Sequence, residues 1–156
     1  MRKVNNAGAA VLELLRDAAL LPTTEGDASF PYAKVDNSNG TYMPVSVERL
    51  RDHKNGCEVW AVAHYYGMNG DLCADPSVEF LRVREGEWYP LSFQQDPMPG
   101  YCSYVILDED TMMPHSGNVY RQSDCAVFCG KWMRNIREQQ GLKPITLNAR
   151  RKRNVK

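Results

Sequence analysis

The sequence lacks several features that mark membrane proteins and secreted proteins. No apolar run in its 156 residues approaches the ~20 residues needed to cross a bilayer. The N-terminus carries two cations, but Glu13, Arg16 and Asp17 interrupt the apolar stretch that follows, which is not the pattern of a signal peptide. The five cysteines are an odd number and include no Cys-x-x-Cys pair, so we expect neither a disulfide framework nor a structural zinc site. We therefore expect a cytoplasmic protein with reduced thiols and no membrane association.

Motifs of common enzyme classes are missing as well. The sequence contains neither G-x-x-x-x-G-K-[ST] nor G-x-G-x-x-G, the glycine-rich loops that bind nucleotide phosphates, which argues against a conventional NTPase. None of the three histidines (His53, His64 and His115) stands at a spacing that assigns it a nucleophile or a carboxylate partner. We predict no catalytic residue, no bound metal and no cofactor.

One segment, residues 63–80, combines a histidine with carboxylates and is the strongest candidate for chemistry. Its polar members are His64, Asn69, Asp71, Asp75 and Glu79. A metal or acid–base site would need these groups to converge, but an Asn-Gly turn and a proline separate them, so no common helix face brings them together. Asp71 and Asp75 have the typical places of turn residues, whose carboxylates accept hydrogen bonds from nearby backbone amides. We interpret the five as architectural residues around a turn between two strands, with a hydrolase built on His64 and the carboxylates as an alternative hypothesis.

The formal net charge is zero because two parts of the chain cancel. Residues 148–156 hold five cations and no acid, so the rest of the chain holds 14 Lys or Arg against 19 Asp or Glu, a balance of −5. The cations assigned to partner contact are Arg150, Arg151, Lys152 and Arg153. An acidic body with a short basic tail indicates a charged partner, either nucleic acid or a protein that binds it. The alternative is a solubilising end that contacts nothing.

Helical periodicity occurs near both ends of the chain. Residues 7–21 are rich in strong helix formers, with apolar residues repeating at three and four, and Pro22 ends the pattern. A second helix is predicted from Ser123, as its N-cap, to about Gln140. Residues 108–122 are predicted to form a loop before it.

Between the helices, from Tyr32 to about Leu107, the apolar period changes to two. Three Asn-Gly pairs interrupt this part, and Asn-Gly suits the tight turn of an antiparallel hairpin. The candidate strands are residues 42–50, 57–66, 78–84, 87–93 and 101–107. Short strands at close spacing without intervening helices favour an antiparallel meander. We predict one α+β domain over residues 1–141, with five or six strands and a helix at each end packed against the sheet, followed by a basic tail over residues 142–156.

Aromatic side chains on the predicted strands have two interpretations. An open sheet can use such rings to stack single-stranded bases. Base binding would normally place cations beside the rings, and Arg82 and Arg84 are the main candidates here. Core packing and cross-strand pairing are the favoured reading.

Three blocks of the sequence resemble an uncharacterised domain family that recurs on plasmids, conjugative elements and phages of gut-type Gram-positive bacteria. The blocks are Y-M-P-V-S-V-E-R-L at 42–50, V-A-H-Y-Y-G-M-N-G-D-L-C-A-D-P-S-V-E-F at 62–80 and W-Y-P-L-S-F-Q-Q-D-P-M-P-G-Y at 88–101. The shared pattern is A-H-Y-Y, then N-G-D-L, D-P and Q-Q-D, with Cys73 where the family more often has Met. The resemblance implies a protein of a mobile genetic element that resides in a bacterial host cell.

The resemblance also gives the expected function, because proteins of mobile elements commonly serve replication, transfer or defeat of host defence. We expect a non-enzymatic binding protein that inhibits a host defence nuclease, of anti-CRISPR or antirestriction type, through complementary charge or by covering a protein surface. The expected partner is a nuclease or a nuclease–nucleic acid complex. The alternative is a nucleic-acid-binding accessory protein of plasmid or phage replication or transfer, acting through the basic tail and the sheet aromatics.

Overall fold

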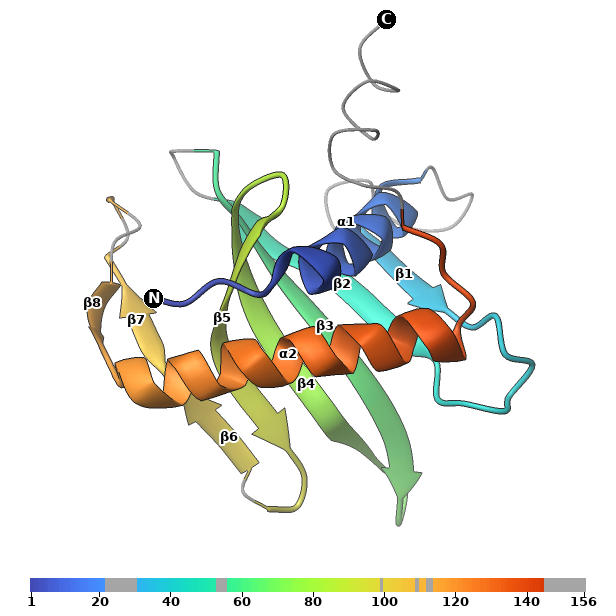
Figure 1. Ribbon diagram of the computed structural model, residues 1–156. Coiled ribbons are helices and arrows are strands. Elements are labelled where there is room, and N and C mark those ends of the chain that lie inside the picture. The colour runs from blue at the N-terminus through green and yellow to red at the C-terminus, as the bar shows by residue number, and fades with distance from the viewer. Residues whose placement is uncertain (22–30, 53–55, 99, 109, 112–113, 145–156) are drawn as a thin grey trace, which may run out of the picture.

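The computed structural model describes residues 1–156 except 22–30, 53–55, 99, 109, 112–113 and 145–156, and the described residues form two helices and two antiparallel sheets (Figure 1). In chain order the elements are α1 (Asn6–Leu20), β1 (Tyr32–Val35), β2 (Val45–Asp52), β3 (Glu58–Met68), β4 (Asp71–Arg84), β5 (Glu87–Gln95), β6 (Gly100–Ser103), β7 (Val105–Leu107), β8 (Pro114–Gly117) and α2 (Val119–Gln139). The predicted α+β fold, a meander sheet with a helix at each end, is confirmed.

The larger sheet is a meander in which each strand pairs with the next one along the chain. Its order is β1-β2-β3-β4-β5-β6, and every pairing is antiparallel. The central β3–β4 hairpin closes at Asn69 and Gly70, whose φ angles of +53° and +84° are the left-handed values of a type I′ turn. Asn and Gly adopt these angles at low cost, which explains why the pair marks the turn in the sequence.

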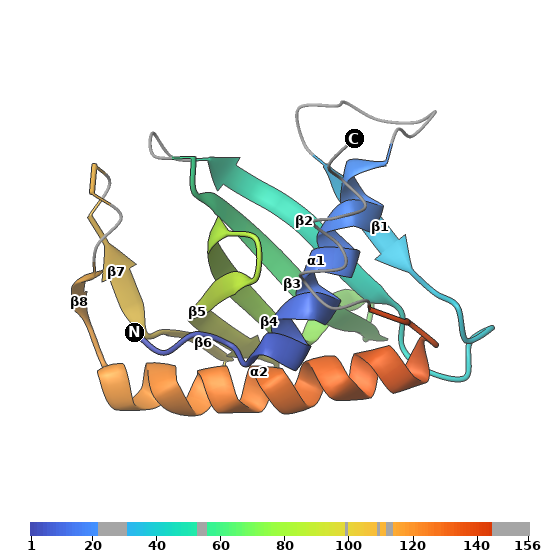
Figure 2. The ribbon, with the colours of Figure 1, turned by 45° about the horizontal axis from the view of Figure 1, so that its top comes forward.

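Both helices pack on one face of this sheet (Figures 1 and 2). The main core cluster joins the apolar sides of α1 and α2 to alternate strand residues, including Trp60, Val62, Val78 and Phe80, all 0% exposed. Alternate residues of a strand point to opposite faces, so this set identifies the face that the helices cover. Neither described helix is long and apolar enough to cross a bilayer.

The opposite face, here called the open face, carries a second and smaller core cluster. Its buried members are Cys57, Val59, Leu81, Leu91 and Val105. Val105 begins β7, so this cluster packs the β7–β8 hairpin against the sheet, at the flank where Figure 1 shows it beside β5 and β6. β3 supplies apolar side chains to both clusters, Trp60 and Val62 to the first and Val59 to the second, as a central strand with two covered faces does.

A network of four charged side chains joins α1 to the sheet. Glu13 is 0% exposed and accepts a hydrogen bond from Nε of Arg82 at 2.8 Å. Arg16 lies on the same side of the helix and binds Glu58 through two N–H groups, at 2.7 and 2.9 Å. Arg82 also approaches Glu58 at 3.7 Å, so the two pairs form one network. A buried charge is costly unless its partner lies within reach, so the network holds α1 at one position on β3 and β4.

The C-terminal helix begins earlier than predicted. α2 starts at Val119 after Asn118, whose side chain caps the helix by accepting a backbone hydrogen bond, and Ser123 lies inside the helix rather than at its N-cap. The predicted loop over residues 108–122 also contains β8, which pairs with β7. The first turn escaped the periodic pattern because the apolar side chains of Val119 and Tyr120 are 59% and 82% exposed instead of facing the core.

Candidate functional site

The residues assigned to the signature turn do not gather at one point. Asn69 lies in the turn itself, and Asp71 is the first residue of β4. His64 and Glu79 belong to the bodies of β3 and β4 and point to opposite faces, because His64 contacts α2 whereas Glu79 lines a groove on the open face. The sheet therefore separates the histidine from this carboxylate.

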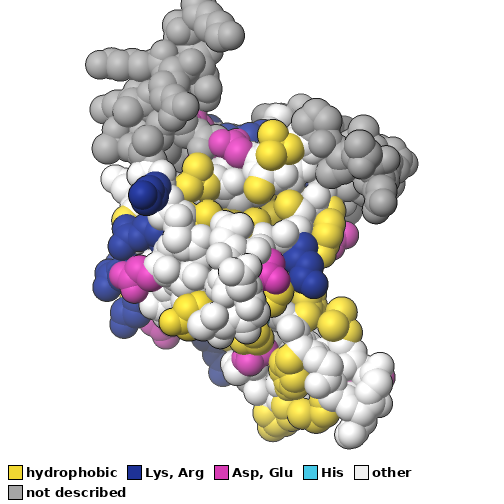
Figure 3. Space-filling view, turned by 90° about the vertical axis from the view of Figure 1, so that its right-hand side faces the viewer, with side chains coloured by type: hydrophobic (Ala, Val, Ile, Leu, Met, Phe, Trp, Pro, Cys, Tyr) yellow, Lys and Arg dark blue, Asp and Glu magenta, His cyan; other side chains and the backbone are white. Residues whose placement is uncertain are grey.

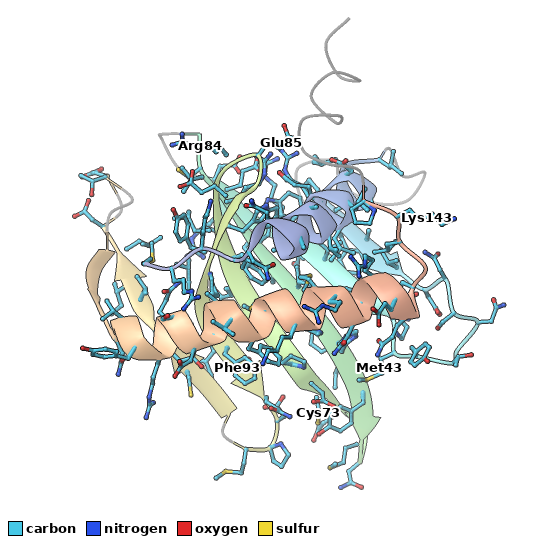
Figure 4. All side chains as sticks on the ribbon, viewed as in Figure 1. Met43, Cys73, Arg84, Glu85, Phe93 and Lys143 are labelled. Carbon is cyan, nitrogen blue, oxygen red and sulfur yellow. The ribbon has the colours of Figure 1, made fainter. Side chains whose placement is uncertain are left out.

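His64 helps to seat α2 on the sheet. Its side chain is 5% exposed, and Nδ1 lies 3.0 Å from the carbonyl oxygen of Pro44. The imidazole meets Trp132 edge-on, with the ring centroids 5.6 Å apart, and Trp132 stacks on Phe128 at 6.0 Å. Phe93, labelled beside α2 in Figure 4, meets Phe128 edge-on at 5.7 Å. The geometry suits positioning of the helix, because little of the imidazole reaches solvent.

Asp75 and Asp96 tie together strand ends that are far apart in the sequence. The carboxylate of Asp96 accepts a hydrogen bond from Ala74 N at 2.9 Å, and Asp96 N donates to Ala74 O at 3.0 Å. Asp75 accepts a hydrogen bond from Nε2 of Gln95 at 3.1 Å, and the Tyr66 hydroxyl donates to the Asp96 carbonyl oxygen at 3.0 Å. The peptide bonds that follow both aspartates are cis. The A-H-Y-Y, D-P and Q-Q-D segments thus meet in one hydrogen-bonded cluster, a convergence that local turn chemistry did not predict.

A row of side chains crosses the open face on all six strands. The register pairs, in order, Tyr32, Glu48, Ala61, Glu79, Ser92 and Ser103. Directly opposed residues of antiparallel strands share a face, so the row lies on the side away from the helices. Small side chains stand on both sides of Glu79, which leaves its carboxylate in a shallow depression of the sheet.

This depression is the floor of a groove with a volume of about 560 Å³. Its charged lining residues are Arg51, Asp52, Glu79 and Asp110, and Leu91, Val105 and Leu107 contribute an apolar wall. The volume lies in the range of small-ligand sites, about 300–1,000 Å³. Three of the four charged lining residues are carboxylates, and one of them, Asp52, is ion-paired with Arg49. The sequence did not reveal it, because the register of the larger sheet and the packing of β7 against that sheet, and not any local motif, bring its lining together.

The acidic character extends well beyond the groove. Residues 55–120 hold ten Asp or Glu and two Arg, a net charge of −8. Both arginines pair within the chain, Arg82 with Glu13 and Arg84 with Glu87, each at 2.8 Å. The segment that forms β3 to β8 therefore presents a surplus of negative charge.

The exposed side of α2 is basic. Lys131 and Arg134 are exposed, and Figure 3 shows Lys and Arg side chains along the margin of the molecule where α2 runs. Residues 119–156 hold ten Lys or Arg against two Asp or Glu, a net charge of +8. The positive part of the chain thus begins in α2, well before the basic tail over residues 148–156.

The basic tail over residues 148–156 lies outside the part of the chain that the structure describes. Arg150, Arg151, Lys152 and Arg153 lie outside the described residues, and their contact with nucleic acid or a partner stays a prediction.

The described aromatic and thiol side chains are divided between core and surface. Trp60 and Trp88 are 0% exposed, whereas Tyr101 on the open face is 58% exposed. Cys125 and Cys129 are buried with their sulfur atoms 4.0 Å apart, and burial raises the pKa of Cys129 well above its usual value. Within the described residues, no group of three or more His, Cys, Asp or Glu side chains is arranged to hold a metal ion.

Comparison with known proteins identifies a family and nothing finer. The sequence model of a family described as a domain of unknown function, DUF6908, matches residues 10–142. No curated protein and no solved structure matches the chain.

Proposed function

The chain belongs to the DUF6908 family, and we propose that it is a non-enzymatic binding protein of a mobile genetic element that inhibits a host defence nuclease of CRISPR or restriction type. The observation that carries this proposal is the acidic segment over residues 55–120, which supplies β3 to β8. A surplus of negative charge in this part of the chain complements the cationic channel in which a nuclease holds nucleic acid. The resemblance to proteins of plasmids, conjugative elements and phages supports host defence as the context.

Apolar side chains at the hairpin ends support a protein partner in particular. Met68 and Leu72 are 47% and 73% exposed at the end of the β3–β4 hairpin, and Met98 is 79% exposed between β5 and β6. Figure 3 shows hydrophobic side chains gathered at the end of the molecule where the β3–β4 hairpin projects. Gathered exposed apolar side chains are typical of surfaces that contact other proteins. No Lys or Arg occurs in residues 55–81, so the β3–β4 hairpin carries carboxylates and no cation of its own at this end.

The structural roles of the candidate acid–base groups support binding rather than catalysis. His64 packs against Trp132, and the carboxylates of Asp75 and Asp96 accept hydrogen bonds from neighbouring segments. Groups engaged in this way stabilise the hairpin ends and the seat of α2, and a binding protein needs both to be rigid.

A plasmid-interference assay tests the proposal. Cells with an active CRISPR or restriction system should accept a targeted plasmid more often when they express this protein. The double variant Asp71→Lys, Asp110→Lys should lose the protection, because it introduces cations into the acidic segment. Asp36→Lys is the matched control, since Asp36 is an exposed acid outside that segment. Absence of protection by the wild-type protein in every such system would refute the proposal.

Nucleic-acid binding is the second candidate function, as an accessory protein of plasmid or phage replication or transfer. The exposed Lys131 and Arg134 favour it, because they extend the basic character of the tail along α2. Direct measurement of DNA and RNA binding, with and without residues 148–156, separates it from the first. Binding that disappears with the tail supports the second candidate.

A further inference from the structure

We propose that the groove on the open face binds the ammonium group of a lysine side chain from a partner protein, with the Glu79 carboxylate as the counter-charge. This inference rests on the proposed function in so far as it names the chemistry of the partner surface. The site itself is defined by the groove alone.

Two polar side chains in the groove lack partners. Glu79 on β4 stands directly opposite Ser92 on β5, and both line the groove. Ser92 is only 3% exposed, and Glu79 is half-buried. Within the part of the chain that the structure describes, neither side chain has a hydrogen-bond or ion-pair partner. Because both line the groove, the carboxylate and the hydroxyl are open to a bound cation with N–H donors.

The remaining lining fits an ammonium group on an apolar chain. Ser103 stands opposite Ser92, so one row offers a carboxylate and two hydroxyls as acceptors. An ammonium group has three N–H donors to match them. The methylenes of a lysine side chain can pack against Leu91 and Val105 while the charged end reaches Glu79. A guanidinium is a planar fork that prefers a bidentate acceptor, and it matches this row less well.

The charges around the groove favour a cationic ligand over an anionic one. Asp52 is ion-paired with Arg49, and Asp110 adds a further carboxylate to the lining. Arg51 is the one cation that lines the groove among the described residues, and it is exposed. A lysine on a basic protein surface therefore meets the half-buried negative charge of Glu79, as expected if the partner is a nuclease.

Titration of the full-length protein with a short peptide, acetyl-Ala-Leu-Lys-Leu-Ala-amide, tests this site by calorimetry. The peptide should bind, and the same peptide with an acetylated lysine should not, because acetylation removes the charge. Glu79→Gln should weaken binding by about tenfold to a hundredfold, the usual effect of losing a hydrogen bond to a charged group. This variant should fold normally because the Glu79 side chain has no partner to lose, and an unchanged melting temperature verifies it.

Two neighbouring variants serve as matched controls. Glu48→Gln removes an exposed carboxylate from the same row, two strands away, and should leave the affinity for the peptide unchanged. Arg51→Gln removes the competing cation and should leave the affinity unchanged or raise it. A loss of affinity in Arg51→Gln equal to that in Glu79→Gln would overturn the ammonium assignment.

A free amine separates the two sources of an ammonium group. If n-pentylamine binds as tightly as the lysine peptide, the groove is a small-amine site and the partner assignment fails. If neither probe binds, or if Glu79→Gln binds the peptide as well as wild type does, the site does not exist. These measurements need no nuclease, so their failure is distinguishable from failure of the plasmid-interference assay.

Discussion

At the scale of single residues, the buried carboxylate of Glu13 gives a sharp stability prediction. Its side chain is 0% exposed and pairs with Arg82 at 2.8 Å, so Glu13→Ala leaves a buried guanidinium short of its partner. We expect the free energy of unfolding to fall by about 3–5 kcal/mol, measured by urea denaturation. Glu138→Ala is the control, because Glu138 is 65% exposed and lies 3.8 Å from Arg137. That change should cost less than about 1 kcal/mol; equal losses in the two variants would contradict the prediction.

Glu58 in the same network makes stability depend on pH. Burial alone raises the pKa of Glu58, but hydrogen bonds from Arg16 and Trp60, together with the charges of Arg16 and Arg82, outweigh it and lower the pKa from 4.5 to about 2. The carboxylate therefore stabilises the fold above pH 4.5, and this contribution is lost as the pH falls toward 2. A shift of this size corresponds to at most about 3 kcal/mol, because solvent screens part of the interaction.

The variant Glu58→Gln removes the charge of this carboxylate, so its stability should lack this dependence on pH. At pH 7 it should be less stable than wild type by up to about 3 kcal/mol, and the difference should shrink as the pH falls below 4.5. Urea denaturation at a series of pH values measures this difference. Glu48→Gln, which alters an exposed carboxylate, should run parallel to wild type throughout. A constant gap between Glu58→Gln and wild type from pH 7 to pH 2 would show that the carboxylate charge is not the cause.

At the scale of elements, the contact between the two helices depends on glycine. A Cβ at Gly130 of α2 would lie 2.8 Å from Nδ2 of Asn5, the residue whose side chain caps α1 by accepting a hydrogen bond from Gly8 N. Gly130→Ala gains about 1 kcal/mol of helix propensity but crowds the cap, and overpacking costs about 1–3 kcal/mol in addition to a cap worth about 1 kcal/mol. We expect a net loss of about 1–3 kcal/mol in urea denaturation. Gly67→Ala has open space and should be neutral or stabilising.

The elements also show what the sequence could predict and why. The Asn69-Gly70 turn and the alternation along β3 were readable, because both are local consequences of backbone geometry. The first turn of α2 could not be predicted from the sequence, since Tyr120 is apolar but faces solvent. The groove could not be predicted either, because Glu79 and Ser92 are neighbours only through the register of β4 and β5. A single sequence predicts the alternation of apolar and polar residues along a strand far better than it predicts which strand will pair with it.

At the scale of the whole molecule, charge separates along the chain more strongly than the tail alone suggests. Residues 1–118 hold nine Lys or Arg against 17 Asp or Glu, a net charge of −8, and residues 119–156 carry the opposite net charge of +8. A molecule with two such parts can engage a cationic protein with one and nucleic acid with the other. This arrangement suits a nuclease–nucleic acid complex as partner, and it makes the contribution of each part separately measurable.

The salt dependence of nucleic-acid binding measures the basic part. If α2 and the tail contact phosphates, the logarithm of the binding constant falls linearly with the logarithm of salt concentration, by about 0.9 for each cation engaged on duplex DNA. Lys131→Gln with Arg134→Gln should then reduce the slope by about two, and deletion of residues 148–156 by up to about four or five. Lys34→Gln, an exposed cation of the open face, should leave the slope unchanged. If neither change alters the slope, nucleic acid binds to a surface other than α2 and the tail. If the protein does not bind nucleic acid even at low salt, the acidic part of the chain is left as the site of action.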